Sequence, residues 1–354
     1  MAAVYEANRA ICKYVHSTSR GHEAIQLATA YNLLSCDYVS PYYRDESIML
    51  GLDFSPYTLM LQLLAKGDDI FTGGRSYYNH PNYRGADKPT IIHQSSATGM
   101  QAIPTTGVAQ GVKYMQLAKK TKLAVGNGQT ASIEQLPTDD CKLPTDNCQL
   151  PIAICSLGDA SVTEGEVSEA FQFAALHQLP IIFLVQDNDW GISVTSAEAR
   201  TSNAYEYIQG FRGIKRETIN GADFVESYEK MQTIISDVRN NCVPYLVHAK
   251  VPLLGHHTSG VRKDFYRTEE ELLESSKQDP YFILKKQLHY NGVDEVQLLE
   301  IENEATIFIQ AEFDKAVAAA EPIADAEILL QDIFVPTPVT TEKGNRTPAD
   351  KKKY

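Results

Sequence analysis

The chain has 354 residues, of which 43% are hydrophobic and 22% are charged, and its formal net charge is −13. This composition is typical of a globular protein with a sizeable core, and the acidic balance argues against a nucleic-acid partner. The six cysteines form no CxxC pair, which argues against a disulfide framework or a zinc site, and no apolar run reaches the length of a membrane span. Because the first residues lack a signal-peptide pattern, we expect a cytoplasmic protein without a membrane anchor.

The first third of the chain predicts short helices separated by breaks. Residues 1–35 have a helical pattern, Pro41 interrupts it, and residues 55–65 predict an amphipathic helix. Residues 67–89 are rich in Gly, Tyr, Asn and Asp and predict a loop. Glu23 lies within the first pattern, and its residue type favours an exposed helical glutamate over a buried acid beside a site.

Tyr43 and Arg44 follow the break at Pro41. The guanidinium group of an arginine holds phosphate oxygens in a bidentate manner. A Tyr-Arg pair is more often part of a surface salt bridge, so the residues alone leave both interpretations open.

Residues 119–151 contain a near-exact seven-residue repeat, LPTDDCK followed by LPTDNCQ and LP. A proline at every seventh position prevents a heptad helix. We therefore expect a solvated, low-complexity insertion between a helix and a strand. Cys141 and Cys148 are weak evidence for a metal clip, because no histidine accompanies them.

Residues 151–193 predict a strand, a helix and a second strand. The apolar run 152–157 ends at Gly158, and the apolar run 181–185 ends shortly before Asn188. Between them, apolar residues recur at helical spacing at Val167, Ala170, Phe171 and Ala174. A unit of this length joins two parallel strands of one sheet.

Asp159 and Asn188 lie just past the carboxyl ends of these strands. Such ends share one sheet edge, where α/β proteins bind ligands, and oxygen donors suit Mg²⁺ or Ca²⁺ better than zinc. Ser161 and Glu164 have the spacing of a capping box, whose helix would direct free N–H groups toward a phosphate. Gly-Asp and Asn-Asp are also common turn sequences, and neither a GxGxxG fingerprint nor a Walker A sequence occurs.

The remainder of the chain continues the alternation of strands and helices. Residues 208–220 predict a helix leading into a strand, residues 224–239 a helix, and residues 241–251 a strand. The paired His256 and His257 follow this strand, a position that suits proton exchange near neutral pH. Residues 269–320 have a helical pattern.

The sequence GDAS at residues 158–161, followed by NDWGIS from Asn188, resembles the thiamine diphosphate motif. Residues 16–335 resemble the alpha subunit, or the alpha half of a fused chain, of the dehydrogenase component of 2-oxo acid dehydrogenase complexes, especially the branched-chain (2-oxoisovalerate) type. The resemblance implies an α/β thiamine diphosphate-binding fold with a mainly parallel sheet flanked by helices over residues 1–290. It further implies a C-terminal helical segment over 291–335. Residues 336–354 are polar and rich in Pro and Lys, which predicts a disordered tail or linker.

The same resemblance implies a site for thiamine diphosphate and Mg²⁺. The metal ligands would be Asp159, Asn188 and the backbone carbonyl of Trp190. The cofactor-binding residues would be Tyr43, Arg44, Ser96, Gly99, Gly158, Ala160, Ser161 and His257. Of these, Tyr43 and Arg44 would hold the diphosphate, and His257 would also be the catalytic proton donor or orienting group.

Enzymes of this kind decarboxylate a 2-oxo acid oxidatively and pass the acyl group to a lipoyl carrier. The resemblance favours a branched-chain substrate over pyruvate. It implies two partners: a beta subunit that supplies the glutamate activating the cofactor, and a lipoyl-bearing acyltransferase. Because no part of this chain resembles the beta half, we expect activity only with a beta partner.

The chain departs from the family's pattern at Ala97, Gln186 and Leu253. Leu253 stands where relatives often carry an arginine, and the missing charge would come from Arg262 or from the beta chain. The departures keep open the alternative of a catalytically decayed cofactor-binding or scaffold subunit. A transketolase-like thiamine enzyme is a separate alternative.

Overall fold

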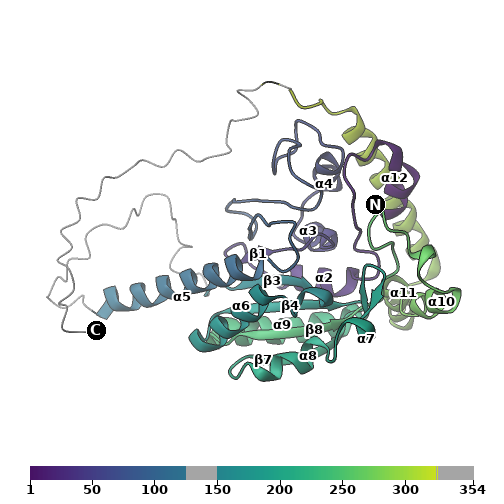
Figure 1. Ribbon diagram of the computed structural model, residues 1–354. Helices are drawn as coiled ribbons and strands as arrows, with labels where there is room; N and C mark the ends of the chain where they lie inside the picture. Colours follow the sequence, from purple (N-terminus) through teal and green to yellow (C-terminus); the bar gives the residue numbers. More distant parts are fainter. Residues whose placement is uncertain (125–149, 324, 326–354) are drawn as a thin grey trace.

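The computed structural model describes residues 1–124, 150–323 and 325, and for residues 119–124 it describes the backbone alone. Its centre is a sheet of six parallel strands in the order β2-β1-β3-β4-β8-β7 (Figure 1). The strands are β1 (Tyr38–Ser40), β2 (Thr90–Ile91), β3 (Ala153–Gly158), β4 (Ile181–Asp187), β7 (Lys215–Asn220) and β8 (Tyr245–Lys250). Parallel strands with helices on both faces confirm the predicted α/β class.

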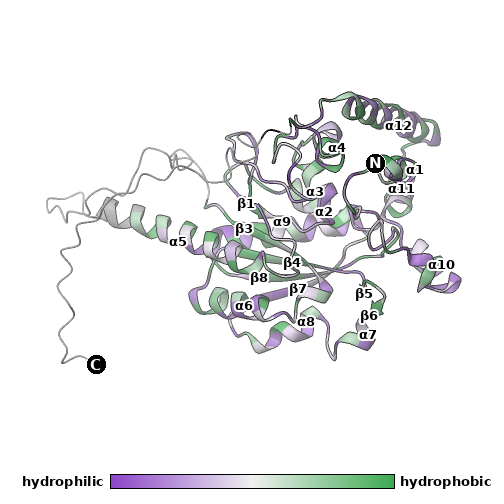
Figure 2. Cartoon of the chain, turned by 45° about the horizontal axis from the view of Figure 1, so that its top comes forward, coloured by the Kyte–Doolittle hydropathy of each residue, from purple (hydrophilic) through white to green (hydrophobic). Residues whose placement is uncertain are grey.

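Apolar side chains of the central strands alternate between two cores, one on each face of the sheet. Ile154 and Ile182 belong to one core, whereas their neighbours Cys155 and Phe183 belong to the other. Helices that contribute to the first core include α2 (Glu23–Ala30), α3 (Glu46–Gly51), α4 (Pro56–Leu63), α9 (Phe224–Asn241) and α12 (Glu295–Ala318). Those of the second core are α5 (Ala102–Ala124), α6 (Gly165–His177) and α8 (Ala204–Tyr207). The apolar strands are therefore enclosed between helices (Figure 2).

Shorter elements complete the described chain. The remaining helices are α1 (Ala2–Ala7), α7 (Ser196–Ala199), α10 (Glu269–Ser276) and α11 (Pro280–Tyr290). Two short strands, β5 (Trp190–Gly191) and β6 (Val194–Thr195), form an antiparallel pair beyond the end of β4. Within the described residues, no helix combines the length and the apolar character that a membrane span requires.

The strand–helix–strand prediction for residues 151–193 is confirmed. β3 and β4 are adjacent and parallel, with Ala153 opposite Ile181 and Gly158 opposite Gln186. The predicted inward face of α6 is fully buried and consists of Val167, Ala170, Phe171 and Ala174. Because the register is continuous, the residues that follow β3 and β4 lie at one edge of the sheet.

Two predictions about helix extent need correction. Helical structure over residues 1–35 is interrupted between η1 (Arg9–Ile11) and α2. The interruption has a physical reason, since Ser17 Oγ donates to the carbonyl oxygen of His257 at 2.7 Å and Ser19 Oγ donates to that of Arg44 at 3.0 Å. The insertion expected over 119–151 begins later than proposed, because the backbone of α5 continues to Ala124. The repeat within residues 125–149 and the tail over 336–354 lie outside the described residues.

Candidate functional site

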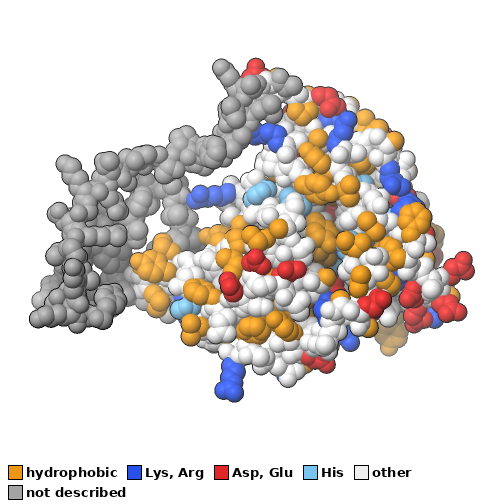
Figure 3. All heavy atoms as spheres, viewed as in Figure 1, with side chains coloured by type: hydrophobic (Ala, Val, Ile, Leu, Met, Phe, Trp, Pro, Cys, Tyr) orange, Lys and Arg blue, Asp and Glu red, His pale blue; other side chains and the backbone are white. Residues whose placement is uncertain are grey.

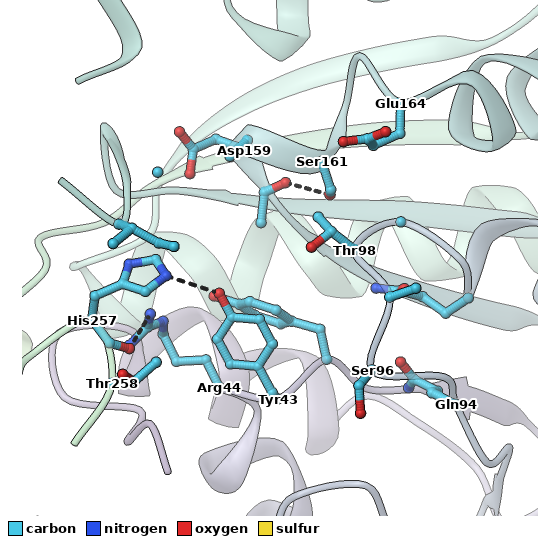
Figure 4. A pocket seen from close by; sticks show the side chains of 18 of the residues that line it. Tyr43, Arg44, Gln94, Ser96, Thr98, Asp159, Ser161, Glu164, His257 and Thr258 are labelled. Carbon is cyan, nitrogen blue, oxygen red and sulfur yellow. Dashed lines mark hydrogen bonds between the residues drawn. The ribbon is translucent and has the colours of Figure 1, made fainter. Parts of the chain in front are cut away.

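A cavity of about 450 Å³ opens at the carboxyl ends of β1, β3 and β4 (Figure 4). This edge is where ligands bind in open α/β sheets. Every residue that the sequence resemblance assigned to metal or cofactor lines this cavity: Tyr43, Arg44, Ser96, Gly99, Gly158, Asp159, Ala160, Ser161, Asn188, Trp190 and His257. The fold thus brings together residues that lie more than 200 positions apart in the chain.

One side of the cavity is formed by the turn after β1 and by the loop after β8. Arg44 is completely buried, and its Nη2 donates to the carbonyl oxygen of His257 at 3.1 Å. The Tyr43 hydroxyl lies 3.3 Å from Nε2 of His257, so the three residues form one wall (Figure 4). Arg44 Nε, His257 Nδ1 and the Tyr42 hydroxyl are buried without a hydrogen-bond partner in the described residues.

His257 is not poised for proton exchange near neutral pH, contrary to the expectation from its residue type. Burial, and then the positive charge of Arg44, lower the pKa of His257 to about 3. The imidazole is therefore neutral at physiological pH and acts as a hydrogen-bonding group. His256 points elsewhere, since its Nδ1 accepts from the backbone N–H of Lys263 at 3.2 Å.

The opposite side of the cavity carries the acidic group of Asp159, which is 3% exposed. Its Oδ2 pairs with Nη2 of Arg200 at 2.6 Å. Burial, and then the nearby carboxylate of Asp187, raise the pKa of Asp159. Arg200 follows α7 and offsets this unfavourable burial of a charge.

Asn188 and Trp190 form a tight turn between β4 and β5. The Asn188 Oδ1 accepts a hydrogen bond from the backbone N–H of Trp190 at 3.1 Å. Asp189 between them has a φ of 68°, in the left-handed region. The side-chain oxygen of Asn188 therefore faces the same turn as the Trp190 backbone.

The described residues contain no group of three or more His, Cys, Asp or Glu side chains that could hold a metal ion. A cation in this cavity would therefore depend on one carboxylate together with amide, carbonyl and ligand oxygens. Mg²⁺ accepts such a set, because it commonly uses one or two carboxylates together with phosphate oxygens.

The helix after Asp159 begins later than the sequence predicted. The N-cap of α6 is Glu164, without a side-chain cap, and Ser161 Oγ instead donates to the carbonyl oxygen of Gly158 at 2.7 Å. The predicted capping box is therefore wrong, because η2 (Asp159–Ser161) inserts a tighter turn before the helix. Gly99 packs against this region with a φ of 82°, and a Cβ there would lie 3.0 Å from Val167. A side chain at position 99 is thus excluded by both backbone and space.

The structure also locates residues that carried other expectations. Glu23 is half-buried beside Arg20 and does not line the cavity, so the prediction of an exposed glutamate is only partly correct. Arg262 pairs with Glu6 and Asp264 and lies outside the cavity, so it does not replace the arginine missing at Leu253.

Several residues of the cavity were not found from the sequence. The additional lining residues include Tyr42, His80, Gln94, Gln101, Ile192 and Thr258. Arg200, the counter-ion of Asp159, was also missed. It lies in a polar segment without hydrophobic period, so no sequence signal pointed to it.

Comparison with known proteins assigns the chain to a family. The model of the dehydrogenase E1 component family matches residues 1–325. The chain therefore belongs to the dehydrogenase E1 component family. Its relatives in this family are alpha subunits, so the chain is an alpha subunit of a decarboxylating 2-oxo acid dehydrogenase component.

The relatives differ in the substrate that their names give. The E1 chain is 28% identical over 297 residues to the 2-oxoisovalerate dehydrogenase subunit alpha of Bacillus subtilis, which covers 81% of this chain and 79% of the relative. It is 31% identical over 183 residues to the pyruvate dehydrogenase E1 component subunit alpha of Rickettsia bellii, and the matched stretch covers 50% of this chain and 54% of the relative. The same subunit of Mycoplasma genitalium is 25% identical over 320 residues, and the matched stretch covers 89% of this chain and 74% of the relative.

Proposed function

We propose that this E1 chain binds thiamine diphosphate together with Mg²⁺ in the cavity at the sheet edge and acts, with a beta subunit, on branched-chain 2-oxo acids. The observation that carries the proposal is the set of buried polar atoms that lack partners at one end of the cavity. They are the Tyr42 hydroxyl, Arg44 Nε and His257 Nδ1. Buried polar atoms nearly always have partners, and a diphosphate would provide them.

The opposite side of the cavity fits the cation. Asp159 would supply a carboxylate, Asn188 its side-chain oxygen and Trp190 its backbone carbonyl. These are the hard oxygen donors that Mg²⁺ prefers. The proposal therefore places the diphosphate between a cationic wall at Arg44 and a cation-binding wall at Asp159.

When bound, thiamine diphosphate supplies the carbanion chemistry by which a 2-oxo acid loses CO₂. The residues of the chain bind and orient. Arg44 provides a fixed positive charge, since it is fully buried and held by the His257 carbonyl. His257 is neutral, and its Nε2 lies 3.3 Å from the Tyr43 hydroxyl, so the imidazole orients that hydroxyl at the cavity wall. Ser96 and Gly99 shape the far wall of the cavity.

An adjoining cavity supports a branched-chain substrate. It has a volume of about 360 Å³ and shares Tyr43, His80, Ser96 and Thr258 with the first cavity. Its remaining walls are Val15, His16, Ser17, Tyr77 and Tyr78. The three tyrosine rings and Val15 offer apolar surface to a branched side chain among the polar residues of this wall, whereas the methyl group of pyruvate would leave most of the space unfilled.

The proposed partners follow from what the chain contains. Among the described residues that line the cavity, the one glutamate is Glu164 at the N-cap of α6. We infer that the beta subunit supplies the activating glutamate and that a lipoyl-bearing acyltransferase accepts the acyl group.

The test is co-expression with a beta subunit, followed by measurement of CO₂ release from branched 2-oxo acids and from pyruvate. Val15→Phe should lower kcat/KM for branched acids by about tenfold more than for pyruvate, because the added ring fills the adjoining cavity. Val225→Phe, at an exposed position of α9, is the matched control. Equal losses for both substrates would contradict the branched-chain assignment.

A further inference from the structure

A chain of buried hydrogen bonds joins the two walls of the cavity from behind. It starts at Asp45, which caps α3 beside Arg44, and passes through Gln186 on β4 and His22 at the start of α2 to Asn188. Asp45, Gln186 and His22 are completely buried, and Asn188 is 6% exposed. None of the first three lines the cavity.

The distances show continuous hydrogen bonding along this chain. Gln186 Nε2 donates to Asp45 Oδ1 at 2.6 Å and to Ser156 Oγ at 2.9 Å. Gln186 Oε1 lies 2.9 Å from His22 Nδ1 and accepts from Gln26 Nε2 at 2.8 Å. His22 Nε2 lies 3.2 Å from Asn188 Nδ2.

Two groups at the ends of this series of hydrogen bonds fix the direction of every hydrogen bond in the series. At one end the Asp45 carboxylate accepts, and its Oδ2 is held by the backbone N–H of Tyr42 at 2.8 Å. Gln186 must therefore turn its amide nitrogen toward Asp45 and its oxygen toward His22. His22 then donates from Nδ1 and accepts at Nε2.

At the other end, the backbone N–H of Trp190 donates to Asn188 Oδ1. The amide nitrogen of Asn188 must then face His22, whose Nε2 is an acceptor. Both ends therefore impose the same orientation on Asn188. A reversed amide would place two acceptors against each other at His22 and two donors against each other at Trp190, at a cost of buried unpaired groups.

We propose that His22 and Gln186 are positioning residues that hold the Asn188 amide with its oxygen toward the divalent cation. The inference rests on the proposed function, in which Asn188 is a metal ligand. It also explains the glutamine at position 186, whose side chain joins four buried groups, and which is therefore not a sign of decay. Groups that orient metal ligands in this way typically contribute about ten- to a hundredfold to metal affinity.

The test measures the binding of Mn²⁺ to the full chain in the presence of thiamine diphosphate. Binding is monitored through the electron paramagnetic resonance signal of free Mn²⁺. His22→Phe removes the acceptor and should weaken Mn²⁺ binding about tenfold or more. His22→Gln is the conservative variant, because its side-chain oxygen can accept from Asn188 Nδ2, and it should stay within about threefold of the wild type. Gln186→Met removes the partner of His22 Nδ1 and should also weaken Mn²⁺ binding. This second variant tests the proposal if the His22→Phe protein does not fold.

Thr29→Val is the matched control. Thr29 is equally buried on α2, and its hydroxyl donates to the Ile25 carbonyl without any link to Asn188. Its variant should lower the melting temperature and leave the Mn²⁺ affinity unchanged. Equal Mn²⁺ affinities for the His22→Phe and Thr29→Val proteins would overturn the positioning role. If the wild-type chain binds no Mn²⁺ with thiamine diphosphate, the proposed function itself fails and this inference falls with it.

Discussion

Arg200 Nη2 lies 2.6 Å from Asp159 Oδ2 and 4.0 Å from Asp187 Oδ1, so one guanidinium serves two carboxylates behind the candidate metal site. The side chains of Arg200 and Asp159 are 8% and 4% exposed. In such a dry environment, the Asp187 carboxylate raises the cost of ionising Asp159. Arg200 therefore supplies the positive charge on which the cation-free site depends.

Replacing Arg200 by methionine is expected to destabilise the cation-free protein by about 3–5 kcal/mol, the usual cost of breaking a buried pair from one side. Mg²⁺ with thiamine diphosphate should raise the melting temperature of this variant more than that of the wild type, because the bound cation replaces the lost charge. Differential scanning calorimetry with and without ligand measures both effects. Arg200→Lys, which keeps the charge, is the control, and an equal ligand-induced shift in all three proteins would contradict the prediction.

Asp159→Asn is expected to abolish the Mg²⁺ dependence of thiamine diphosphate binding while leaving the chain folded. Asparagine keeps the shape of the side chain but removes the charge that attracts the cation. Arg200 keeps a second partner in Asp187, so the guanidinium is not left alone. The measurement is isothermal titration of thiamine diphosphate into the protein, once with Mg²⁺ and once with EDTA. If the variant shows the same difference in cofactor affinity between Mg²⁺ and EDTA as the wild type, Asp159 is not a metal ligand.

The sheet edge was predictable from sequence because its strands and α6 follow simple hydrophobic periods. Phe171 and Phe183 illustrate this, since both lie in apolar patterns and meet edge-to-face in the core. The start of α6 was not predictable, because the tight turn that precedes it depends on the Gly158 carbonyl accepting from Ser161. Local spacing does not show such competition between caps and turns.

Most of the cavity was identified through the resemblance, because neither Tyr43 nor His257 has a pattern of its own. Arg200 was missed because its partner is distant in sequence. Gln186 offered a usable signal, since a polar residue at the end of the apolar run IIFLV must find buried hydrogen-bond partners. The sequence could not tell which partners those are, as they come from α2, α3 and β3.

His22 should make a contribution to the stability of the cation-free protein that decreases as the pH drops below 6.5. Burial, and then the charge of Arg44, lower the pKa of His22 to about 3, below its unfolded value of about 6.5. Between pH 6.5 and pH 3 the unfolded chain binds the proton and the folded chain does not. The contribution of neutral His22 to the free energy of unfolding is therefore complete above pH 6.5 and is lost progressively toward pH 3. From pH 7 to pH 5 the loss is about 2 kcal/mol.

Urea unfolding in EDTA at both pH values, for the wild type and for His22→Gln, isolates this contribution. The variant lacks the titrating group, whereas the other buried acids and histidines are common to both proteins. Its free energy of unfolding should therefore fall by about 2 kcal/mol less than that of the wild type over this interval. Parallel pH profiles would show that His22 is protonated equally in both states.

The last prediction concerns the beta subunit. α5 and α6 pack side by side, and their outer faces expose Tyr114, Leu117, Phe173 and Leu176, the last with 70% of its surface accessible. Hydrophobic side chains also gather over these helices on the surface shown in Figure 3. Contiguous exposed apolar surface is typical of a protein–protein interface. We expect the beta subunit to cover this face and to close the cavity.

The isolated chain should then bind thiamine diphosphate with Mg²⁺ more weakly than the alpha–beta complex does. By linkage, the cofactor must strengthen alpha–beta association by the same factor. Calorimetric titration of cofactor into each form measures the first effect, and titration of beta into alpha with and without cofactor measures the second. Leu176→Glu should weaken association, whereas Tyr290→Glu, at a 92% exposed aromatic residue on α11, should not. Equal cofactor affinity in the two forms, or CO₂ release by the purified alpha chain alone, would refute a site shared between the subunits.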